Sequence, residues 1–150
     1  MQIEPIAYVR AERLAPTDDH WGQSVARIEL VDAMPSEALT GLDAFSHAEI
    51  LFVFDRVAPS TVERGARHPR GNPDWPCVGI LAQRAKDRPN RIGTTIVRIL
   101  GVEGRTLRVA ELDAIDGTPV LDIKPVMREF LPREAVNQPG WATELMREYW

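Results

Sequence analysis

The sequence predicts a mainly β fold, closed as a barrel or stacked as a sandwich. Short apolar segments recur along its 150 residues, and turns rich in glycine and proline separate them. In residues 25–31 apolar and charged side chains alternate with a period of two, which is typical of a half-buried strand. Helical periodicity is nearly absent before the C-terminal segment. Many short strands with little helix favour a barrel or a sandwich.

The N-terminal half is expected to alternate strands with loops. Residues 3–9 are apolar but contain Pro5, so we expect an edge strand there. Residues 10–22 are polar and predict a loop. Residues 35–39 predict one or two helical turns. Residues 50–57 are apolar and rich in β-forming side chains, which predicts a strand.

The C-terminal half is expected to hold a long loop, four strands and a helix. Residues 58–76 contain four prolines and two glycines, which predicts a long surface loop. The four strands are expected at residues 78–81, 94–102, 106–112 and 120–123, with a hairpin turn at residues 101–104. We expect a short C-terminal helix at residues 141–149. Its apolar face packs on the barrel or across a dimer, and consists of Trp141, Met146, Tyr149 and Trp150.

Length and composition favour one soluble domain that spans residues 1–150. Apolar residues make up 44% and charged residues 27%, which is ordinary for a globular protein. The single Cys77 excludes an internal disulfide, fits a reducing compartment and is expected to be buried. The sequence shows neither the features of a signal peptide nor an apolar run of roughly 18 residues. We therefore expect a cytoplasmic protein with no membrane partner.

The charge is distributed unevenly. The net charge is −4, which argues mildly against a nucleic-acid binder. Yet 16 of the 18 basic residues are arginine, and six arginines lie between Arg64 and Arg91. Because arginine presents a planar, bidentate fork to carboxylates and phosphates, this cluster predicts a focused anion site.

Four polar strings interrupt the apolar scaffold. Each places charged side chains beside glycine or proline, which free or fix the backbone. Loops of this composition on a rigid scaffold usually hold a ligand. The strings are residues 67–71, Arg84 with residues 88–93, residues 113–119, and residues 122–125.

Some of these residues have plainer interpretations. Asp116 and Gly117 are a common pair in a simple hairpin turn. Ser46 and His47 invite a nucleophile interpretation, but neighbours in a strand point to opposite faces, and no Gly-x-Ser-x-Gly motif is present. We predict no metal site, because no His or Cys set complements the polar side chains of residues 18–20.

Together the strings carry a resemblance that no single one carries. The matching segments, some of which lie outside the four strings, are Gly41-Leu42 with Phe45-Ser46-His47, Pro69-Arg70-Gly71, Gly79 with Ala82 and Arg84, Arg88-Pro89-Asn90 with Ile92-Gly93, Asp116-Gly117-Thr118-Pro119, and Asp122-Ile123-Lys124-Pro125. In this order they resemble the TrmO (TsaA-like, YaeB-like) family of S-adenosylmethionine-dependent tRNA methyltransferases. The resemblance covers roughly residues 5–127.

The resemblance implies a single-sheeted β-barrel that dimerises and binds S-adenosylmethionine without a Rossmann sheet. It implies N6-methylation of threonylcarbamoyl-adenosine beside the anticodon of tRNA. The implied donor-binding residues are Ser46, His47, Arg84, Leu112, Asp113, Asp116, Gly117, Thr118 and Pro119. The expected substrate-binding residues are Arg67, Arg70, Arg88, Asn90 and Lys124. The side chains of residues 67–70 fit carboxylates of a dimer partner equally well.

The chain departs from the family in the parts that would define the RNA substrate. It has Arg91 where relatives usually have a second proline, and Val126 in place of an aromatic residue. We also expect no second, C-terminal domain. One alternative is an S-adenosylmethionine-binding module that does not methylate RNA, and another is a methyltransferase for a different small or nucleoside substrate. The catalytic base stays open among His47, Asp113 and Asp116.

Overall fold

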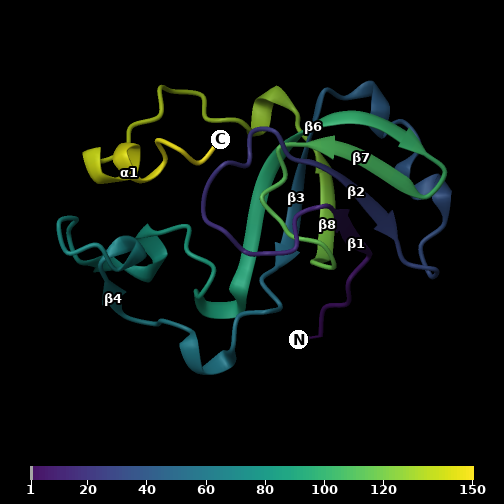
Figure 1. The fold of residues 1–150 in the computed structure, drawn as a ribbon. Helices are drawn as coiled ribbons and strands as arrows, with labels where there is room; N and C mark the ends of the chain where they lie inside the picture. The colour runs from purple at the N-terminus through teal and green to yellow at the C-terminus, as the bar shows by residue number, and fades with distance from the viewer. Residues whose placement is uncertain (1) are drawn as a thin grey trace.

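The computed structural model describes residues 2–150 and shows a closed barrel of six strands (Figure 1). Neighbouring strands are antiparallel, in the order β1-β2-β7-β6-β3-β8, and β8 pairs back onto β1. The predicted mainly β barrel is therefore confirmed, and the sandwich is excluded. The barrel strands are β1 (Ala7–Ala11), β2 (Val25–Leu30), β3 (His47–Val53), β6 (Ile92–Glu103), β7 (Thr106–Ala110) and β8 (Pro119–Pro125).

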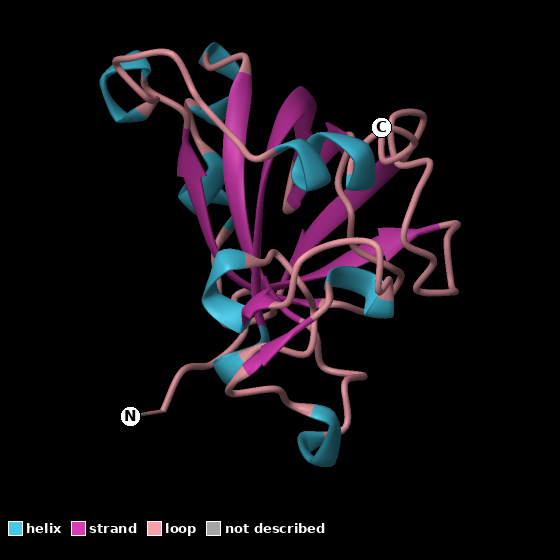
Figure 2. Cartoon of the chain, turned by 90° about the vertical axis from the view of Figure 1, so that its left-hand side faces the viewer, coloured by secondary structure: helices cyan, strands magenta, loops and turns pink. Residues whose placement is uncertain are grey.

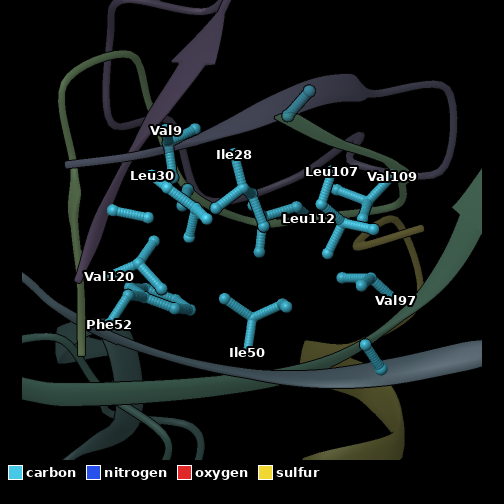
Figure 3. Close-up of a cluster of buried hydrophobic side chains, with 14 of the residues drawn as sticks. Val9, Ile28, Leu30, Ile50, Phe52, Val97, Leu107, Val109, Leu112 and Val120 are labelled. Carbon is cyan, nitrogen blue, oxygen red and sulfur yellow. The ribbon is translucent and has the colours of Figure 1, made fainter. Parts of the chain in front are cut away.

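Alternation along each strand separates an apolar interior from the outer face. In β3 the side chains of Ala48, Ile50 and Phe52 are buried, whereas those of His47 and Glu49 are only partly buried. Figure 3 shows side chains from the barrel strands meeting in this interior. Because a slip of one residue would turn every side chain to the other face, the core fixes the register of the strands.

Several strand boundaries differ from the prediction. The first strand starts at Ala7 and pairs on both sides, so the expected edge strand at residues 3–9 is wrong. Closure of the barrel leaves no edge for it to occupy. The predicted turn at residues 101–104 begins too early, because Gly101 belongs to a bulge in β6. The chain turns at Gly104, whose φ of 57° suits a glycine.

Between β3 and β6 the chain leaves the barrel. Residues 54–91, here called the excursion, extend to one side of it (Figure 1). They contain a two-stranded ladder, β4 (Ala66–Arg67) with β5 (Val78–Gly79). The long loop predicted at residues 58–76 is thus confirmed in outline. The strand predicted at residues 78–81 ends early, because the chain enters a 3-10 turn at Ile80.

Helical structure is confined to short turns around the barrel (Figure 2). The helix α1 (Gly140–Leu145) is shorter than the predicted helix at residues 141–149. It ends early because Glu148 and Tyr149 pair with the loop between β1 and β2, accepting hydrogen bonds from the backbone amides of His20 and Trp21 at 2.9 and 2.7 Å. The 3-10 turns are Ser36–Leu39, Leu42–Ala44, Pro59–Thr61, Pro69–Gly71, Ile80–Ala82, Pro89–Arg91 and Arg128–Phe130.

Two single features complete the comparison with the sequence. Cys77 is exposed, which contradicts the expected burial. It lies in the excursion, just before β5, and does not belong to the core of the barrel. Within residues 2–150, no helix is both long enough and apolar enough to cross a membrane.

The substitution Gly93→Ala should destabilise the barrel. A Cβ atom at Gly93 would lie 2.5 Å from the ring of Phe52 and 2.9 Å from that of Phe54, and these rings already pack edge to face. Overpacking of this kind costs about 1–3 kcal/mol, so we expect urea unfolding to show a loss of that size in the free energy of unfolding. Gly79→Ala is the matched control, because nothing lies within 4 Å of its Cβ. Equal losses in both variants would contradict this packing of β6 on the core.

Candidate functional site

Pairing of β3 with β8 brings together two of the segments that carry the family resemblance, residues 45–47 and residues 122–125. The register places Ala48 opposite Pro125, and the amide that follows Pro125 donates to the carbonyl of His47 at 3.0 Å. Residues 45–47 and residues 122–125 therefore form one continuous surface, here called the β3–β8 patch.

A recess of about 360 Å³ opens beside this patch. Small-molecule sites usually have volumes of roughly 300–1,000 Å³, so the recess is large enough for a ligand. Its walls are mostly apolar, and the patch contributes Phe45, Asp122, Ile123 and Pro125 to them. The other lining residues are Ile6, Leu30, Met34, Ala38, Leu39, Thr40, Gly41 and Leu42.

The hydroxyl of Ser46 contacts the ring of His47. The Oγ of Ser46 lies 2.7 Å from Nδ1 of His47. Strand alternation does not separate these side chains as the sequence suggests, because β3 begins only at His47. This is the single side-chain hydrogen bond recorded for His47 within residues 2–150, so Nε2 is left for a ligand or a proton.

Asp122 and Lys124 supply one charge of each sign to the patch. The Nζ of Lys124 donates to Oδ2 of Asp122, and Oδ1 accepts from the amide of Ile123 at 2.9 Å. The hydrogen bond to Asp122 raises the pKa of Lys124 above its usual value, so the ammonium stays charged. Both side chains are about half exposed, and such pairs contribute little to stability. The pair is therefore available to a ligand that carries both charges.

Arg98 is a cation at this patch that the sequence analysis misses. It lies opposite His47 in the pairing of β3 with β6, and it is exposed. Among the described residues it has no ion-pair partner. Period-two alternation places Arg98 on the outer face, but no local pattern in the sequence tells which strand is its neighbour.

The carboxylate of Asp113 is held by two hydroxyl groups. Its Oδ1 accepts from Oγ1 of Thr95, and its Oδ2 accepts from the phenol of Tyr149. Burial raises the pKa of Tyr149, and the negative charge of Asp113 raises it further, so the phenol remains a donor. Because both oxygens are engaged, Asp113 is a weaker candidate for the catalytic base than His47. Its neighbour Leu112 is 1% exposed and belongs to the core.

The turn at residues 116–119 is engaged with β1. The Oδ1 of Asp116 accepts from the amide of Ala11 at 3.1 Å, and the amide of Gly117 donates to the carbonyl of Val9 at 2.8 Å. Gly117 has a φ of 81°, which favours glycine. These contacts support the plainer interpretation of the string as a turn between strands. Contact of this turn with a donor stays a prediction.

Two arginines predicted to meet the substrate are paired within the chain. Arg67 forms a bidentate pair with Asp87 inside the excursion. Arg70 forms a bidentate pair with Asp19, with N–O distances of 2.7 and 2.9 Å, and so ties the excursion to the loop between β1 and β2.

Within residues 2–150, no three His, Cys, Asp or Glu side chains are grouped so that they could hold a metal.

The remaining predicted residues of the excursion also make internal contacts. Arg84 donates to the carbonyl of Thr94, and Arg88 donates to the carbonyl of Gln83 at 2.8 Å. Asn90 adopts a left-handed conformation with a φ of 63°, which asparagine tolerates. Arg84 thus contacts β6 at Thr94, which pairs with Leu51 of β3, whereas Arg88 makes its contact within the excursion. Contact of Arg84 with the donor, and of Arg88 and Asn90 with a substrate, stays a prediction.

The chain was compared with protein families, curated proteins and solved structures, and these comparisons agree on one family. The sequence model of the tRNA-methyltransferase O N-terminal domain matches residues 8–130. The chain belongs to the TrmO family. The matched range contains both strings of the β3–β8 patch, and the resemblance found in the sequence is confirmed.

Individual relatives give the same result. A human protein named tRNA (adenine(37)-N6)-methyltransferase is 38% identical over 105 residues, which are 70% of this chain and 23% of that protein. A probable S-adenosyl-L-methionine-binding protein of Pyrococcus abyssi is 35% identical over 142 residues, which are 91% of this chain and 73% of that protein. The crystal structure of TrmO from Pseudomonas aeruginosa superposes with a TM-score of 0.74 at 31% identity, covering 95% of this chain and 62% of that one. The chain thus spans less than two thirds of the human protein and of the crystallised TrmO.

The Arg70–Asp19 pair should make stability depend on pH. The hydrogen bonds from Arg70 hold the pKa of the Asp19 carboxyl below its ordinary value of 3.8. Since the folded pKa is the lower one, the pair stabilises the fold above about pH 4 and loses this effect as the pH falls through the folded pKa. At pH 7 we expect Asp19→Asn to lower the melting temperature by about 2–4 °C, which corresponds to roughly 1 kcal/mol for a partly exposed pair.

Thermal unfolding of both proteins from pH 7 to pH 2 measures this effect. The difference in melting temperature should shrink towards zero at the acid end. Asp18→Asn is the control, because the carboxylate of Asp18 has only a 3.7 Å contact with Lys86, and its backbone contact with Arg70 is kept in the variant. A difference that stays constant over this range would show that the Asp19 charge does not act through Arg70.

Proposed function

We propose that this chain binds S-adenosylmethionine at the β3–β8 patch and methylates N6 of adenine 37 in tRNA, with threonylcarbamoyl-adenosine as the substrate nucleoside. The observation that carries this proposal is the register of β3 with β8. It joins two strings of the TrmO family beside a recess of suitable volume. The name of the human relative supports the reaction.

The residues of the patch fit the chemistry of this donor. S-adenosylmethionine combines an adenine and a ribose diol with an ammonium and a carboxylate. The apolar walls of the recess suit the adenine, while Asp122 suits the ammonium or the diol and Lys124 suits the carboxylate. Because Asp122 and Lys124 form a weak pair with each other, the donor can replace both contacts at small cost.

The side chains of the patch also fit the proton transfer that the reaction needs. The bound donor supplies a methyl group on a positively charged sulfur. A nitrogen conjugated to a carbonyl is a poor nucleophile until it loses its proton, so a general base helps. In this proposal Nε2 of His47 accepts the proton from N6, while Ser46 holds the ring through Nδ1. The recess holds the donor beside the patch, which helps to align the two reactants.

The proposed RNA partner is an anticodon loop, whose bases are already unpaired and can be splayed out. Arg98 is exposed beside His47 and has no carboxylate partner among residues 2–150, so it suits a backbone phosphate near the reacting base. The net charge of −4 favours such focused contacts over a basic surface.

A second candidate function is donor binding without methyl transfer. The specific observation in its favour is the relative from Pyrococcus abyssi, which is named for S-adenosylmethionine binding and of which the chain covers 73%. In this candidate the donor binds at the same patch, but no methyl group is transferred, so His47 has no role as a base. The two candidates therefore differ in transfer and not in binding.

Substitutions at the patch should separate donor binding from transfer. Lys124→Ala removes a charge-assisted contact and should weaken donor affinity about tenfold or more, measured by calorimetry. Lys86→Ala is the matched control, because Lys86 lies in the excursion and is the only other lysine. His47→Gln should leave donor affinity within about twofold, yet slow transfer of labelled methyl to total tRNA about 100-fold or more.

The outcomes of this experiment are distinct. Binding without transfer by the unaltered protein, with tRNA that carries the substrate nucleoside, would support the second candidate. Full transfer by His47→Gln would exclude the histidine as the base. Equal affinities of Lys124→Ala and Lys86→Ala would move the donor away from the β3–β8 patch.

We also propose that the chain forms a homodimer through the outer face of β6. On this face Ile92, Ile96 and Leu100 are 37%, 46% and 36% exposed, which places three large apolar side chains in one row. Such patches often mark protein interfaces. The row also contains Arg98, so a second copy would lie beside the patch and enclose it further.

The substitution Ile96→Asp should break this dimer. A carboxylate at position 96 would lose its water on entering this apolar row, which is unfavourable even beside Arg98. Light scattering should give twice the chain mass of 16.8 kDa for the unaltered protein and a single chain mass for the variant. Leu81→Asp is the control, since Leu81 is 76% exposed in the excursion. Dissociation in both variants, or a monomeric unaltered protein, would count against the β6 face.

A further inference from the structure

Three arginines form a row across neighbouring strands of the barrel. The register pairs Arg10 of β1 with Arg27 of β2, and Arg27 with Arg108 of β7. Their side chains lie on the outer face and are 46%, 60% and 45% exposed. Figure 1 shows β2 and β7 on the side of the barrel away from the excursion. These three residues, here called the arginine row, are therefore separate from the arginine cluster of residues 64–91.

The arginine row carries more positive charge than the nearby carboxylates balance. Glu29 is the only acidic residue in β1, β2 and β7. Arg10 donates to it from Nε at 3.0 Å, and Nε of Arg27 lies 3.6 Å from the same carboxylate. Arg108 lies 3.6 Å from Glu103, the last residue of β6. Two carboxylates thus serve three guanidinium groups.

This arrangement is unfavourable in the chain alone. Like charges directly opposite each other on neighbouring strands are destabilising, and exposed ion pairs such as those with Glu29 and Glu103 contribute little. A bound polyanion would remove the repulsion and take over the weak ion pairs. A protein partner fits less well, because the core of a protein interface is depleted of charged residues. The row therefore suits the phosphates of a nucleic acid.

The position of the row connects it with the β3–β8 patch. Neighbouring strands lie about 4.8 Å apart, so the three guanidinium groups are spread over about 10 Å across the strands. Arg98 of β6 lies opposite Ala110, two residues after Arg108 in β7, and on its other side it lies opposite His47 of β3. An RNA whose reacting base lies at His47 can thus continue past Arg98 onto the row.

We propose that the arginine row is a second RNA-binding surface, which binds the phosphate backbone of tRNA outside the nucleotides that enter the β3–β8 patch. The inference rests on the proposed function for the identity of the RNA and for the place of its reacting base. Each guanidinium presents a bidentate fork to a phosphate, so the contacts do not depend on base sequence. A dimer through β6 leaves Arg10 and Arg27 accessible, because β7 lies between β2 and β6.

Binding of fluorescently labelled total tRNA, measured at rising salt concentrations, tests the row. We expect the double variant Arg27→Gln, Arg108→Gln to bind about tenfold more weakly at low salt, and the slope of log affinity against log salt to become shallower by between about one and two. The matched control is Arg133→Gln, Arg147→Gln. It makes the same change in net charge at two exposed arginines outside the barrel strands, and it should keep most of the affinity and the slope.

The substitution Glu29→Gln should act in the opposite direction. It removes the carboxylate that Arg10 and Arg27 share, so both guanidinium groups become free for phosphate and tRNA binding should strengthen about twofold or more. Glu134→Gln is its control, because it makes the same change in net charge at an exposed residue outside the barrel. This variant keeps all three arginines, so the test stays decisive if the double arginine variant does not fold.

Several outcomes would overturn the proposal. Equal losses in the two double variants would mean that net charge matters and the row does not. Unchanged or weaker binding by Glu29→Gln would show that phosphates do not compete for its arginine partners. A change from dimer to monomer mass in Arg27→Gln, Arg108→Gln would assign the row to a protein contact. Row-dependent tRNA binding without methyl transfer would support the row and reject the proposed reaction, whereas transfer with unchanged tRNA affinity in this variant would reject the row alone.

Discussion

The pairing of β8 with both β1 and β3 is the constraint on which the rest of the structure depends. It closes the sheet, so that the barrel has no edge strand, and it encloses the apolar interior formed by residues such as Ile50, Phe52 and Val120. Because the core permits only one register, it also determines which outer side chains become neighbours. The placement of Lys124 opposite Glu49, and of Pro125 next to the start of β3 at His47, is therefore a consequence of closure.

The loops are organised by a different kind of interaction. The excursion, the loop between β1 and β2, and the C-terminal segment contact one another through charged and aromatic side chains. Arg70 binds Asp19, and the indole of Trp75 donates to Glu144 of α1 at 2.8 Å. Within the arginine cluster, Arg67, Arg84, Arg88 and Arg91 also donate to groups of the chain, so most of the cluster is engaged internally. Arg98, on a barrel strand, is left as a cation beside the patch.

The sequence predicts those parts of the fold that depend on local patterns. Period-two alternation locates β2, and the proline-rich composition of residues 58–76 predicts the excursion in outline. Prediction from the sequence fails where a contact between residues far apart in the chain determines the local structure. The helix α1 ends early because Glu148 and Tyr149 bind the loop at His20, and Asp113 is engaged by Tyr149, which no local pattern shows. Residues 45–47 and residues 122–125 are recognisable in the sequence as family-like segments. That they lie side by side depends on the register of β3 with β8, which the sequence does not show.

Backbone amide chemical shifts, recorded with and without S-adenosylmethionine, test the central claim most directly. The claim is that closure of the barrel assembles the donor site at the β3–β8 patch. It predicts the largest shift changes in residues 45–47 and residues 122–125, with little change in the loop between β1 and β2. Changes confined to residues 112–119 and that loop would contradict it.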